Sequence, residues 1–285
     1  MLIGEGAHGC AFRPPLRCVG ASDDHDPPVL GNAIGKVFRY SGAGADEEVS
    51  TAALASRFGA PKLIARCEVV PADAAGCLTV GTRLDQLLYE DVGRSSLSTV
   101  LAAPKKSIRW VDFEALLKGF ADGVLGPMDA MRREGFVHMD IHAGNVVVGE
   151  GGSMRLIDFS WVRPLRNFWS PRSFLRFTLY EFAHAPPATP HSDWDPLAIR
   201  ALRRLNEMLP PSHAPMLPEA AGFDPDGAGL LLWALVLRAR PPPDSRAHVL
   251  ETAALVAAGL THPDVRVRVA TAQDARRALV DSLAH

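Results

Sequence analysis

The sequence predicts an α+β protein with two lobes, a small strand-rich one at residues 1–92 and a larger helical one at residues 93–285. In the first third, short apolar runs are separated by breaks rich in Gly and Pro, a pattern typical of strands and turns. From residue 113 onward, apolar residues recur at steps of three and four, as they do in helices. A Gly-Arg-Ser-Ser break at 93–96 separates the two patterns and marks the expected boundary between the lobes.

The composition is that of an ordinary globular protein. The chain has 285 residues, of which 47% are apolar and 22% charged, and this length is sufficient for two lobes with a cleft between them. The net charge of −2 gives no basic field that would favour nucleic acid or an anionic membrane. Because no apolar run reaches about 18 residues, we expect neither a transmembrane helix nor a signal peptide.

All four cysteines, Cys10, Cys18, Cys67 and Cys77, lie in the first third of the chain. None of them stands in C-x-x-C spacing, which argues against a zinc site. We therefore expect buried or free thiols in a reducing, cytoplasmic setting.

Close to the N-terminus, Gly4, Gly6 and Gly9 stand in G-x-G-x-x-G spacing. Glycines let backbone N–H groups approach phosphate oxygens closely. A dinucleotide-binding fold would place a strand before this motif and a helix after it. Here three residues precede it, and residues 10–12 look like a strand. We therefore expect the tip of a β-hairpin that cradles phosphate.

A lysine follows this hairpin, after a loop-like segment at residues 14–32. Lys36 lies in the predicted strand 33–38, where it either points at the phosphates or is a solvated edge residue. The next predicted helix, 46–58, has acids in its first turn, which favours its dipole. Glu47 or Glu48 could pair with Lys36, and the small apolar residues around Glu48 favour that one; the alternative is that both acids only serve the helix N-terminus.

Residues 78–92 form another apolar segment, which ends in Leu-Leu-Tyr-Glu-Asp-Val. If the break that follows links two lobes, the backbone at Glu90 and Val92 can form hydrogen bonds with the edge of an adenine. Tyr89 would then limit the back of that pocket.

The densest set of polar side chains follows a long predicted helix at residues 113–133. His138, Asp140, His142 and Asn145 stand in one short loop, and a strand-like run then leads to Asp158. Two aspartates and an asparagine around a hairpin can hold metal ions and orient a hydroxyl. Phosphoryl transfer from a nucleotide requires such a site. Further helices are predicted at residues 197–209, 230–237, 249–258 and 272–283.

Together these motifs resemble the eukaryotic-type protein kinase family. The matching residues are Gly4, Gly6, Gly9, Lys36, His138-Met-Asp140, Asn145 and Asp158-Phe-Ser160. The resemblance implies a bilobal protein-kinase-like fold in which residues 1–92 and 93–285 are the N-lobe and C-lobe of one kinase domain. It also implies ATP and Mg²⁺ (or Mn²⁺) as cofactors and γ-phosphoryl transfer to a protein hydroxyl, of Ser or Thr. We expect no nucleic-acid or membrane partner.

The resemblance implies roles for individual residues. The catalytic residues are Asp140, Lys36 and Glu48; the ATP-binding residues are Ile3, Gly4, Gly6, Gly9, Ala11, Ala33, Lys36, Glu90 and Val92; the metal ligands are Asn145 and Asp158. His138, Asp193, Glu181 and Arg266 are the supporting residues. Asp193 would cap the backbone of the catalytic loop from the start of a buried helix. Glu181 and Arg266 would form a structural ion pair.

The sequence departs from the family pattern in three places. Met139 replaces the arginine that precedes the catalytic aspartate, so we expect no dependence on a phosphorylated activation loop. His142 stands where Ser/Thr kinases have lysine, and Ser160 replaces the glycine after Asp158-Phe159. The opening segment at residues 9–18 is similar to kinase-like proteins of large DNA viruses, which adds the virion or the host cell as settings.

Three alternatives remain open. The His-Met-Asp-Ile-His-Ala-Gly-Asn loop also resembles that of small-molecule kinases such as aminoglycoside and choline phosphotransferases. A second alternative is a pseudokinase, which only binds partners. Such a protein is expected to lack the lysine or a metal-binding acid, whereas this sequence retains Lys36, Asp140, Asn145 and Asp158. As a third, His138, Asp140 and His142 occupy alternate positions and could form a metal-ligand cluster.

Overall fold

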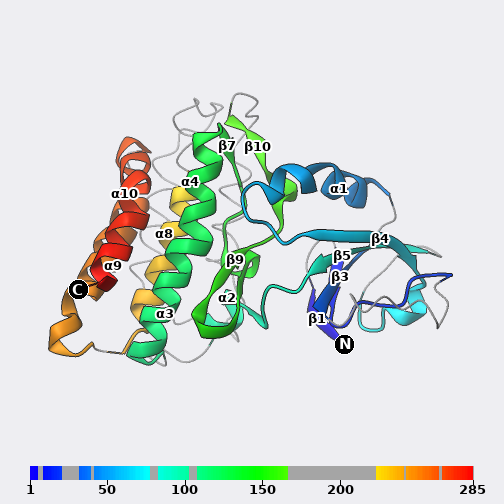
Figure 1. Cartoon of the computed structure of the whole chain (residues 1–285), viewed down its shortest axis with the longest axis horizontal. Coiled ribbons are helices and arrows are strands. Elements are labelled where there is room, and N and C mark those ends of the chain that lie inside the picture. Colours follow the sequence, from blue (N-terminus) through cyan, green and yellow to red (C-terminus); the bar gives the residue numbers. More distant parts are fainter. Residues whose placement is uncertain are drawn as a thin grey trace, which may run out of the picture. The chain divides into compact units, whose positions relative to one another are not determined.

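The computed structural model describes residues 1–5, 9–20, 32–39, 42–77, 83–102, 108–165, 223–240, 242–262 and 265–284. It separates into two compact units, Met1–Val92 and Gly93–His285 (Figure 1). The sequence pattern places its boundary between the same two residues. The first unit is built on an antiparallel sheet and the second is mostly helical, so the protein is of the α+β class. Among the helices within these residues, none is both long enough and apolar enough to span a membrane.

The first unit contains a five-stranded antiparallel sheet. Its strands are β1 (Leu2–Glu5), β2 (Gly9–Phe12), β3 (Ala33–Phe38), β4 (Leu63–Val69) and β5 (Leu84–Glu90), in the order β1-β2-β3-β5-β4. β1 and β2 pair as a hairpin in which Glu5 lies opposite Cys10. The predicted strand at 33–38 is confirmed, and so is the hairpin pairing expected around the glycine motif.

One face of this sheet packs against helix α1 (Ala43–Ser56), which the sequence placed at 46–58. Phe38, Ala45 and Leu87 form a small buried cluster between helix and sheet. Side chains alternate between the two faces of a strand, so Lys36, two residues before Phe38, belongs to the same face. The face covered by α1 is therefore the one that carries the lysine.

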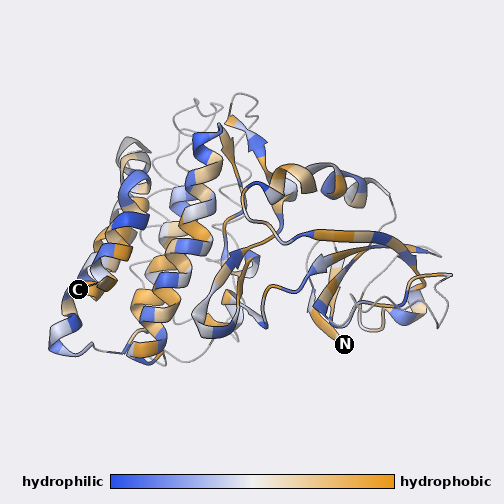
Figure 2. Cartoon of the chain, viewed as in Figure 1, coloured by the Kyte–Doolittle hydropathy of each residue, from blue (hydrophilic) through white to orange (hydrophobic). Residues whose placement is uncertain are grey.

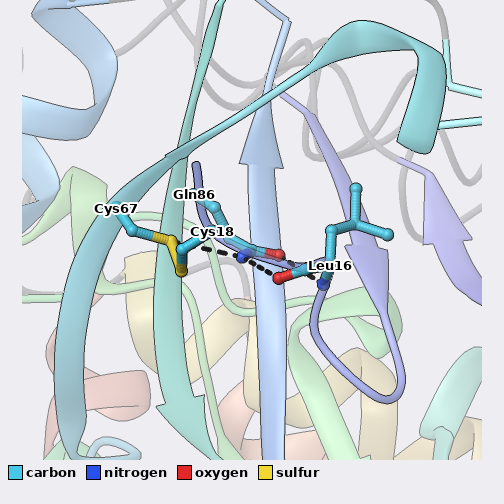
Figure 3. Close-up of a disulfide and its surroundings, with 4 residues drawn as sticks. All are labelled: Leu16, Cys18, Cys67 and Gln86. Atoms are coloured by element: carbon cyan, nitrogen blue, oxygen red, sulfur yellow. Dashed lines mark hydrogen bonds between the residues drawn. A yellow bond between two sulfur atoms is a disulfide. The ribbon is translucent and has the colours of Figure 1, made fainter. Parts of the chain in front are cut away.

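The other face holds a second apolar cluster, which is closed by two disulfides. Cys10 in β2 is joined to Cys77, and Cys18 is joined to Cys67 in β4 (Figure 3). No free cysteine is left, so the expectation of free thiols is wrong. The bonded residues are 67 and 49 positions apart in the sequence, and the sheet brings them together. The argument for a reducing compartment is thereby removed.

Gln86 fixes the segment around Leu16, which covers this face of the sheet. Its side chain is fully buried; Oε1 accepts from the Leu16 N–H at 2.9 Å and Nε2 donates to the Leu16 carbonyl at 2.8 Å (Figure 3). The amide of Gln86 thus binds the N–H and the carbonyl of Leu16, as the backbone of a neighbouring strand would. A Cβ at Gly35 would lie 2.2 Å from the Gln86 Oε1, so only a glycine leaves room for the amide.

The second unit is a helical body with two small sheets. Within the described residues its helices are α2 (Leu97–Leu101), α3 (Trp110–Phe120), α4 (Gly126–Arg133), α8 (Phe223–Arg238), α9 (Ala247–Leu260) and α10 (Val265–Ala284). The π-helical turn Ala121–Leu125 joins α3 to α4, so the predicted helix at 113–133 is confirmed as one helical run. In Figure 2 this run is hydrophobic along α3 and more hydrophilic along α4. The helices predicted near 230–237, 249–258 and 272–283 are also confirmed; 197–209 lies outside the described residues.

Five short strands of this unit hold the polar loop. β6 (Ser95–Ser96), β8 (Val146–Val148) and β9 (Met154–Leu156) form one sheet, and β7 (Phe136–Val137) pairs with β10 (Arg163–Pro164). β7 ends immediately before the loop and β8 begins immediately after it. Both ends of the loop are therefore fixed by strand pairing.

Candidate functional site

The polar loop and Asp158 are brought together by the β8–β9 hairpin. Val146 lies opposite Leu156 in this hairpin. Beyond the last pair, the Ile157 N–H donates to the Asn145 carbonyl at 2.8 Å. Asp158 therefore leaves the hairpin beside the residue that ends the loop. This is the placement that the sequence predicted for the two residues.

Asn145 holds Asp140 by two hydrogen bonds. Its Nδ2 donates to the Asp140 Oδ2 at 2.7 Å and to the Asp140 carbonyl at 3.1 Å. Asn145 is buried, and a carboxylate acceptor makes the shorter bond charge-assisted. The side chain of Asp140 is thus fixed relative to its own backbone.

His142 lies near the same carboxylate oxygen of Asp140 that Asn145 binds. Its Nδ1 accepts from the Gly144 N–H at 3.1 Å, so in the neutral ring the proton is on Nε2. This Nε2 lies 3.5 Å from the Asp140 Oδ2, a distance at which a hydrogen bond is weak and the contact is mainly electrostatic. The ring therefore presents an N–H toward Asp140.

His138 supports the loop from inside the protein. Its ring is fully buried, meets the ring of Phe159 edge-on at 4.7 Å, and its Nδ1 accepts from the Asp140 N–H at 3.3 Å. Burial lowers the pKa of His138 to about 4, although the charges of Asp140 and Asp158 oppose the shift. The ring is neutral at pH 7 and serves as a packing and positioning group. Since its Nδ1 is taken by the loop and no group of three or more metal-ligating His, Cys, Asp or Glu residues occurs in the described part of the chain, the three-residue metal cluster is not supported.

Asp224 caps the backbone of this loop. Its Oδ2 accepts from the His138 N–H at 2.6 Å and its Oδ1 from the Met139 N–H at 2.9 Å. Burial raises the pKa of Asp224 to about 6, and the two N–H donors oppose that rise. The sequence assigned this role to Asp193, which lies outside the described residues; both N–H groups are bonded to Asp224 instead. Asp224 is followed directly by an apolar run, which forms the buried helix α8 (Phe223–Arg238).

Helix α8 packs directly against the loop that Asp224 caps. A Cβ at Gly227 would lie 2.4 Å from the Ile141 carbonyl oxygen, so the helix can approach this closely only with glycine at that position. The side chains of α8 are buried on nearly all sides, as expected for a helix at the centre of a helical body. The loop therefore rests on a helix that is buried along most of its described length.

Asp158 has an unusual backbone conformation. Its φ is +58°, in the left-handed region that few residues other than glycine adopt. Ser160, which stands where the family pattern has glycine, donates from Oγ to the Asp158 Oδ1 at 2.7 Å. The serine thus fixes one oxygen of the predicted metal ligand.

The oxygen donors of Asn145 and Asp158 suit a hard cation. Because the Asn145 Nδ2 is bonded to Asp140, Oδ1 is the amide atom left for a ligand. Mg²⁺ prefers oxygen ligands, keeps several waters and commonly takes only one or two side chains plus phosphates in nucleotide sites. Two side chains of this kind therefore fit magnesium and do not require a larger cluster.

In the first unit, Lys36 pairs with Glu48 and not with Glu47. The Lys36 Nζ lies 2.6 Å from the Glu48 Oε2, and it also lies 5.4 Å from the centre of the Phe38 ring. The Tyr89 hydroxyl donates to the other oxygen, Oε1, at 2.6 Å. The predicted Lys36–Glu48 pair thus forms. Tyr89, which the sequence analysis placed only at the back of an adenine pocket, also binds Glu48.

The glycine motif is described in part. Gly4 and Gly9 lie in β1 and β2, whereas Gly6 lies outside the described residues. A Cβ at Gly9 would lie 2.1 Å from the Val37 carbonyl, so packing against β3 already requires glycine there. Ala11 pairs with Lys36 across β2 and β3, and so shares its face.

Ile3, Ala33 and Glu90 also belong to the predicted nucleotide site. Ile3 is 39% exposed at the bulge of β1. Ala33 is three residues from Lys36, so strand alternation puts it on the opposite face; the neighbour on the face of Lys36 is Ile34. That Ala33 binds ATP stays a prediction. The Glu90 N–H donates to the Lys62 carbonyl at 3.0 Å.

Val92 ends the first unit, two residues after β5. Glu181 lies outside the described residues, and Arg266 lies in the first turn of α10 with its side chain outside the description. The predicted ion pair between them therefore stays a prediction.

A buried charge pair in the second unit was missed by the sequence interpretation. Asp226 and Arg268 are both buried, at the starts of α8 and α10. Burial raises the pKa of Asp226 to about 6, while the charge of Arg268 opposes this. The only sequence signal was a second acid one turn into an otherwise apolar helix.

No protein-family model matches the chain, and no curated protein is significantly similar to it in sequence.

Proposed function

We propose that this chain is an ATP- and Mg²⁺-dependent phosphotransferase of the eukaryotic protein kinase type, which transfers the γ-phosphoryl group to a Ser or Thr hydroxyl of a protein. The observation that carries the proposal is the fixed carboxylate of Asp140, bonded to Asn145 at 2.7 Å in a loop whose backbone Asp224 caps. Strand pairing fixes both ends of this loop, and Asp224 binds its backbone N–H groups. A fixed loop that presents one acid is suited to positioning a hydroxyl. Positioning supplies much of the catalysis in phosphoryl transfer.

In the proposed reaction, Asp140 orients the acceptor hydroxyl. Its Oδ2 is bonded to Asn145, so Oδ1 is the oxygen that accepts the hydrogen bond of the substrate. The hydroxyl oxygen forms a bond to the γ-phosphorus as the bond between that phosphorus and the leaving ADP oxygen breaks. The proton of the hydroxyl passes to Asp140.

The first unit binds the nucleotide in this proposal. Lys36 contacts the phosphates as a cation, and Glu48, at 2.6 Å, orients its ammonium group. The glycine motif that joins β1 to β2 would bring backbone N–H groups to the same phosphates. The carbonyl of Glu90 and the backbone of Val92 would bind the adenine edge.

The second unit provides the metal ligands. Asn145 Oδ1 and the carboxylate of Asp158 would hold Mg²⁺, for which oxygen donors are appropriate. The metal, when bound, would neutralise charge that develops on the phosphates. The bond from Ser160 to the Asp158 Oδ1 would then keep that ligand in one orientation.

A small-molecule acceptor is the second candidate. The observation that favours it is the contact of the His142 Nε2 with the Asp140 carboxylate at 3.5 Å, because this histidine belongs to the loop that resembles small-molecule kinases. In that case the acceptor would be the hydroxyl of an amino alcohol or an aminoglycoside. The role of Asp140 would be the same.

The test is transfer from γ-labelled ATP with Mg²⁺ to three kinds of acceptor: the chain itself, a Ser/Thr-rich protein such as casein, and a small amino alcohol or aminoglycoside. We expect label on protein hydroxyls, and a loss of at least about 100-fold in Asp140→Ala. Asp274→Asn, an exposed aspartate of α10, is the matched control and should keep full activity. Label on the small acceptors alone would favour the second candidate. ATP binding without any transfer would favour a pseudokinase.

A further inference from the structure

The Tyr89 hydroxyl and the Lys36 ammonium group bind the same carboxylate. Tyr89 donates to Oε1 of Glu48 at 2.6 Å, and Lys36 lies 2.6 Å from Oε2. Each oxygen thus has its own short, charge-assisted partner. Glu48 is 8% exposed, so water has little access to replace either partner.

The three residues come from three different elements of the first unit. Lys36 lies in β3, Tyr89 in β5 and Glu48 in α1. In the register of the sheet Lys36 lies opposite Leu87, and Tyr89 is two residues further along β5, on the same face. Both donors are therefore fixed by the ladder of the sheet, whereas the carboxylate belongs to the helix.

This arrangement determines the orientation of the carboxylate. With Lys36 as its only partner, the Glu48 side chain could rotate and still keep the ion pair, since an ammonium group accepts many directions of approach. A second donor on the other oxygen leaves one orientation that satisfies both. The Tyr89 hydroxyl thereby restrains Glu48, and Glu48 in turn restrains Lys36.

We propose that Tyr89 is a positioning residue for the phosphate-binding lysine: its hydroxyl holds Glu48, and through Glu48 it fixes the Lys36 ammonium group. This inference rests on the proposed function, because it assigns Lys36 to ATP phosphates. It differs from a role for Tyr89 as a wall of an adenine pocket, which would depend on the ring and not on the hydroxyl.

The test measures binding by calorimetry for two ligands, MgATP and adenosine. Tyr89→Phe keeps the ring and removes only the hydroxyl. We expect MgATP to bind about tenfold more weakly to this variant, as for the loss of a hydrogen bond to a charged group. Adenosine, which has no phosphates, should bind as well as it does to the wild type. Ser56→Ala, which removes a hydroxyl from the same unit at the end of α1, is the control and should change neither affinity.

A double-mutant cycle adds the link to Glu48. In a Glu48→Gln background, Tyr89→Phe should cause less than a twofold further loss of MgATP affinity, because the charged acceptor is already gone. Unchanged MgATP binding in Tyr89→Phe, equal losses for MgATP and adenosine, or additive losses in the cycle would each overturn this inference while leaving the proposed function intact. A wild-type chain that binds no MgATP would overturn both.

Discussion

Asp224 and His138 are 86 residues apart in the sequence, yet the carboxylate of the first accepts the backbone N–H of the second at 2.6 Å. The same carboxylate also accepts the Met139 N–H, and Met139 has a φ of +74°, outside the region that side-chain-bearing residues usually adopt. The cap therefore holds a strained turn immediately before Asp140. The position of the catalytic acid in the proposed function depends on a residue far away in the chain.

Asp224→Ala should release these two amides. Removing the carboxylate leaves two buried N–H groups without their acceptor, which favours local opening of the loop. We expect hydrogen exchange of His138 and Met139 to accelerate by at least about tenfold, measured by NMR or by mass spectrometry of the peptide that contains them. Asp244→Asn, an exposed aspartate that begins a short 3₁₀ turn, is the control. Unchanged protection in Asp224→Ala would show that the cap does not hold the loop.

The buried acids should make stability fall as the pH rises. The pKa of Asp226 is about 6 in the folded chain, above its ordinary value of 3.8, because burial disfavours the charged form. The folded state therefore binds more protons than the unfolded state between these values. The contribution of Asp226 to stability should be complete below about pH 4 and should decrease as the pH rises to about 6. Asp224, whose pKa is also raised to about 6, contributes in the same direction.

Asp226→Asn isolates this contribution. The variant cannot titrate, so the decline in the urea midpoint between pH 4 and pH 6 should be shallower than in the wild type. The exposed Asp274→Asn variant should retain the wild-type slope. Identical slopes in Asp226→Asn and the wild type would contradict the prediction.

The two disulfides should contribute strongly to the stability of the first unit. They close loops of 67 and 49 residues, for which the entropy of the unfolded chain predicts about 4 kcal/mol each. We expect the double variant Cys18→Ala with Cys67→Ala to unfold at a clearly lower urea concentration. Alkylation of the denatured, unreduced wild type should modify none of its cysteines. Modification of all four would contradict the disulfides.

Local patterns in the sequence were enough for part of the site. Lys36 and Glu48 lie in a strand and the next helix, so the sequence suggested their pairing. It also placed Asp140 and Asn145 in one short loop, but it did not predict the hydrogen bond between them. Ala33 stands an odd number of residues from Lys36, so strand alternation puts its side chain on the other face of the sheet.

The long-range partners could not be obtained in this way. Asp224 was missed because the family resemblance assigned the cap to Asp193, and the hydrogen bonds of Asp224 to the loop appear only in the packed structure. The disulfides were missed because Cys18 and Cys67 become neighbours only when β4 and the covering segment pack on the sheet. Sequence spacing carries no information about contacts over such separations, which depend on the tertiary fold.

A pair of helical glycines tests whether α8 has to approach the loop so closely. A Cβ at Gly227 would lie 2.4 Å from the Ile141 carbonyl, a backbone atom that cannot move without shifting the loop. A Cβ at Gly126 would have its nearest neighbour at 3.7 Å, which is ordinary contact. Alanine favours helix over glycine by about 1 kcal/mol, so the helix preference is the same in both variants and only the space differs.

Gly126→Ala should therefore be neutral or slightly stabilising, whereas Gly227→Ala should be destabilising by about 1–3 kcal/mol in urea unfolding. Gly227→Ala should also lower phosphoryl transfer, since Ile141 follows Asp140 directly and the loop must shift to admit a methyl group. If both variants were equally stable and equally active, α8 would not be the rigid support of the loop. The position of Asp140 would then have to be set by Asn145 and the strand ends alone.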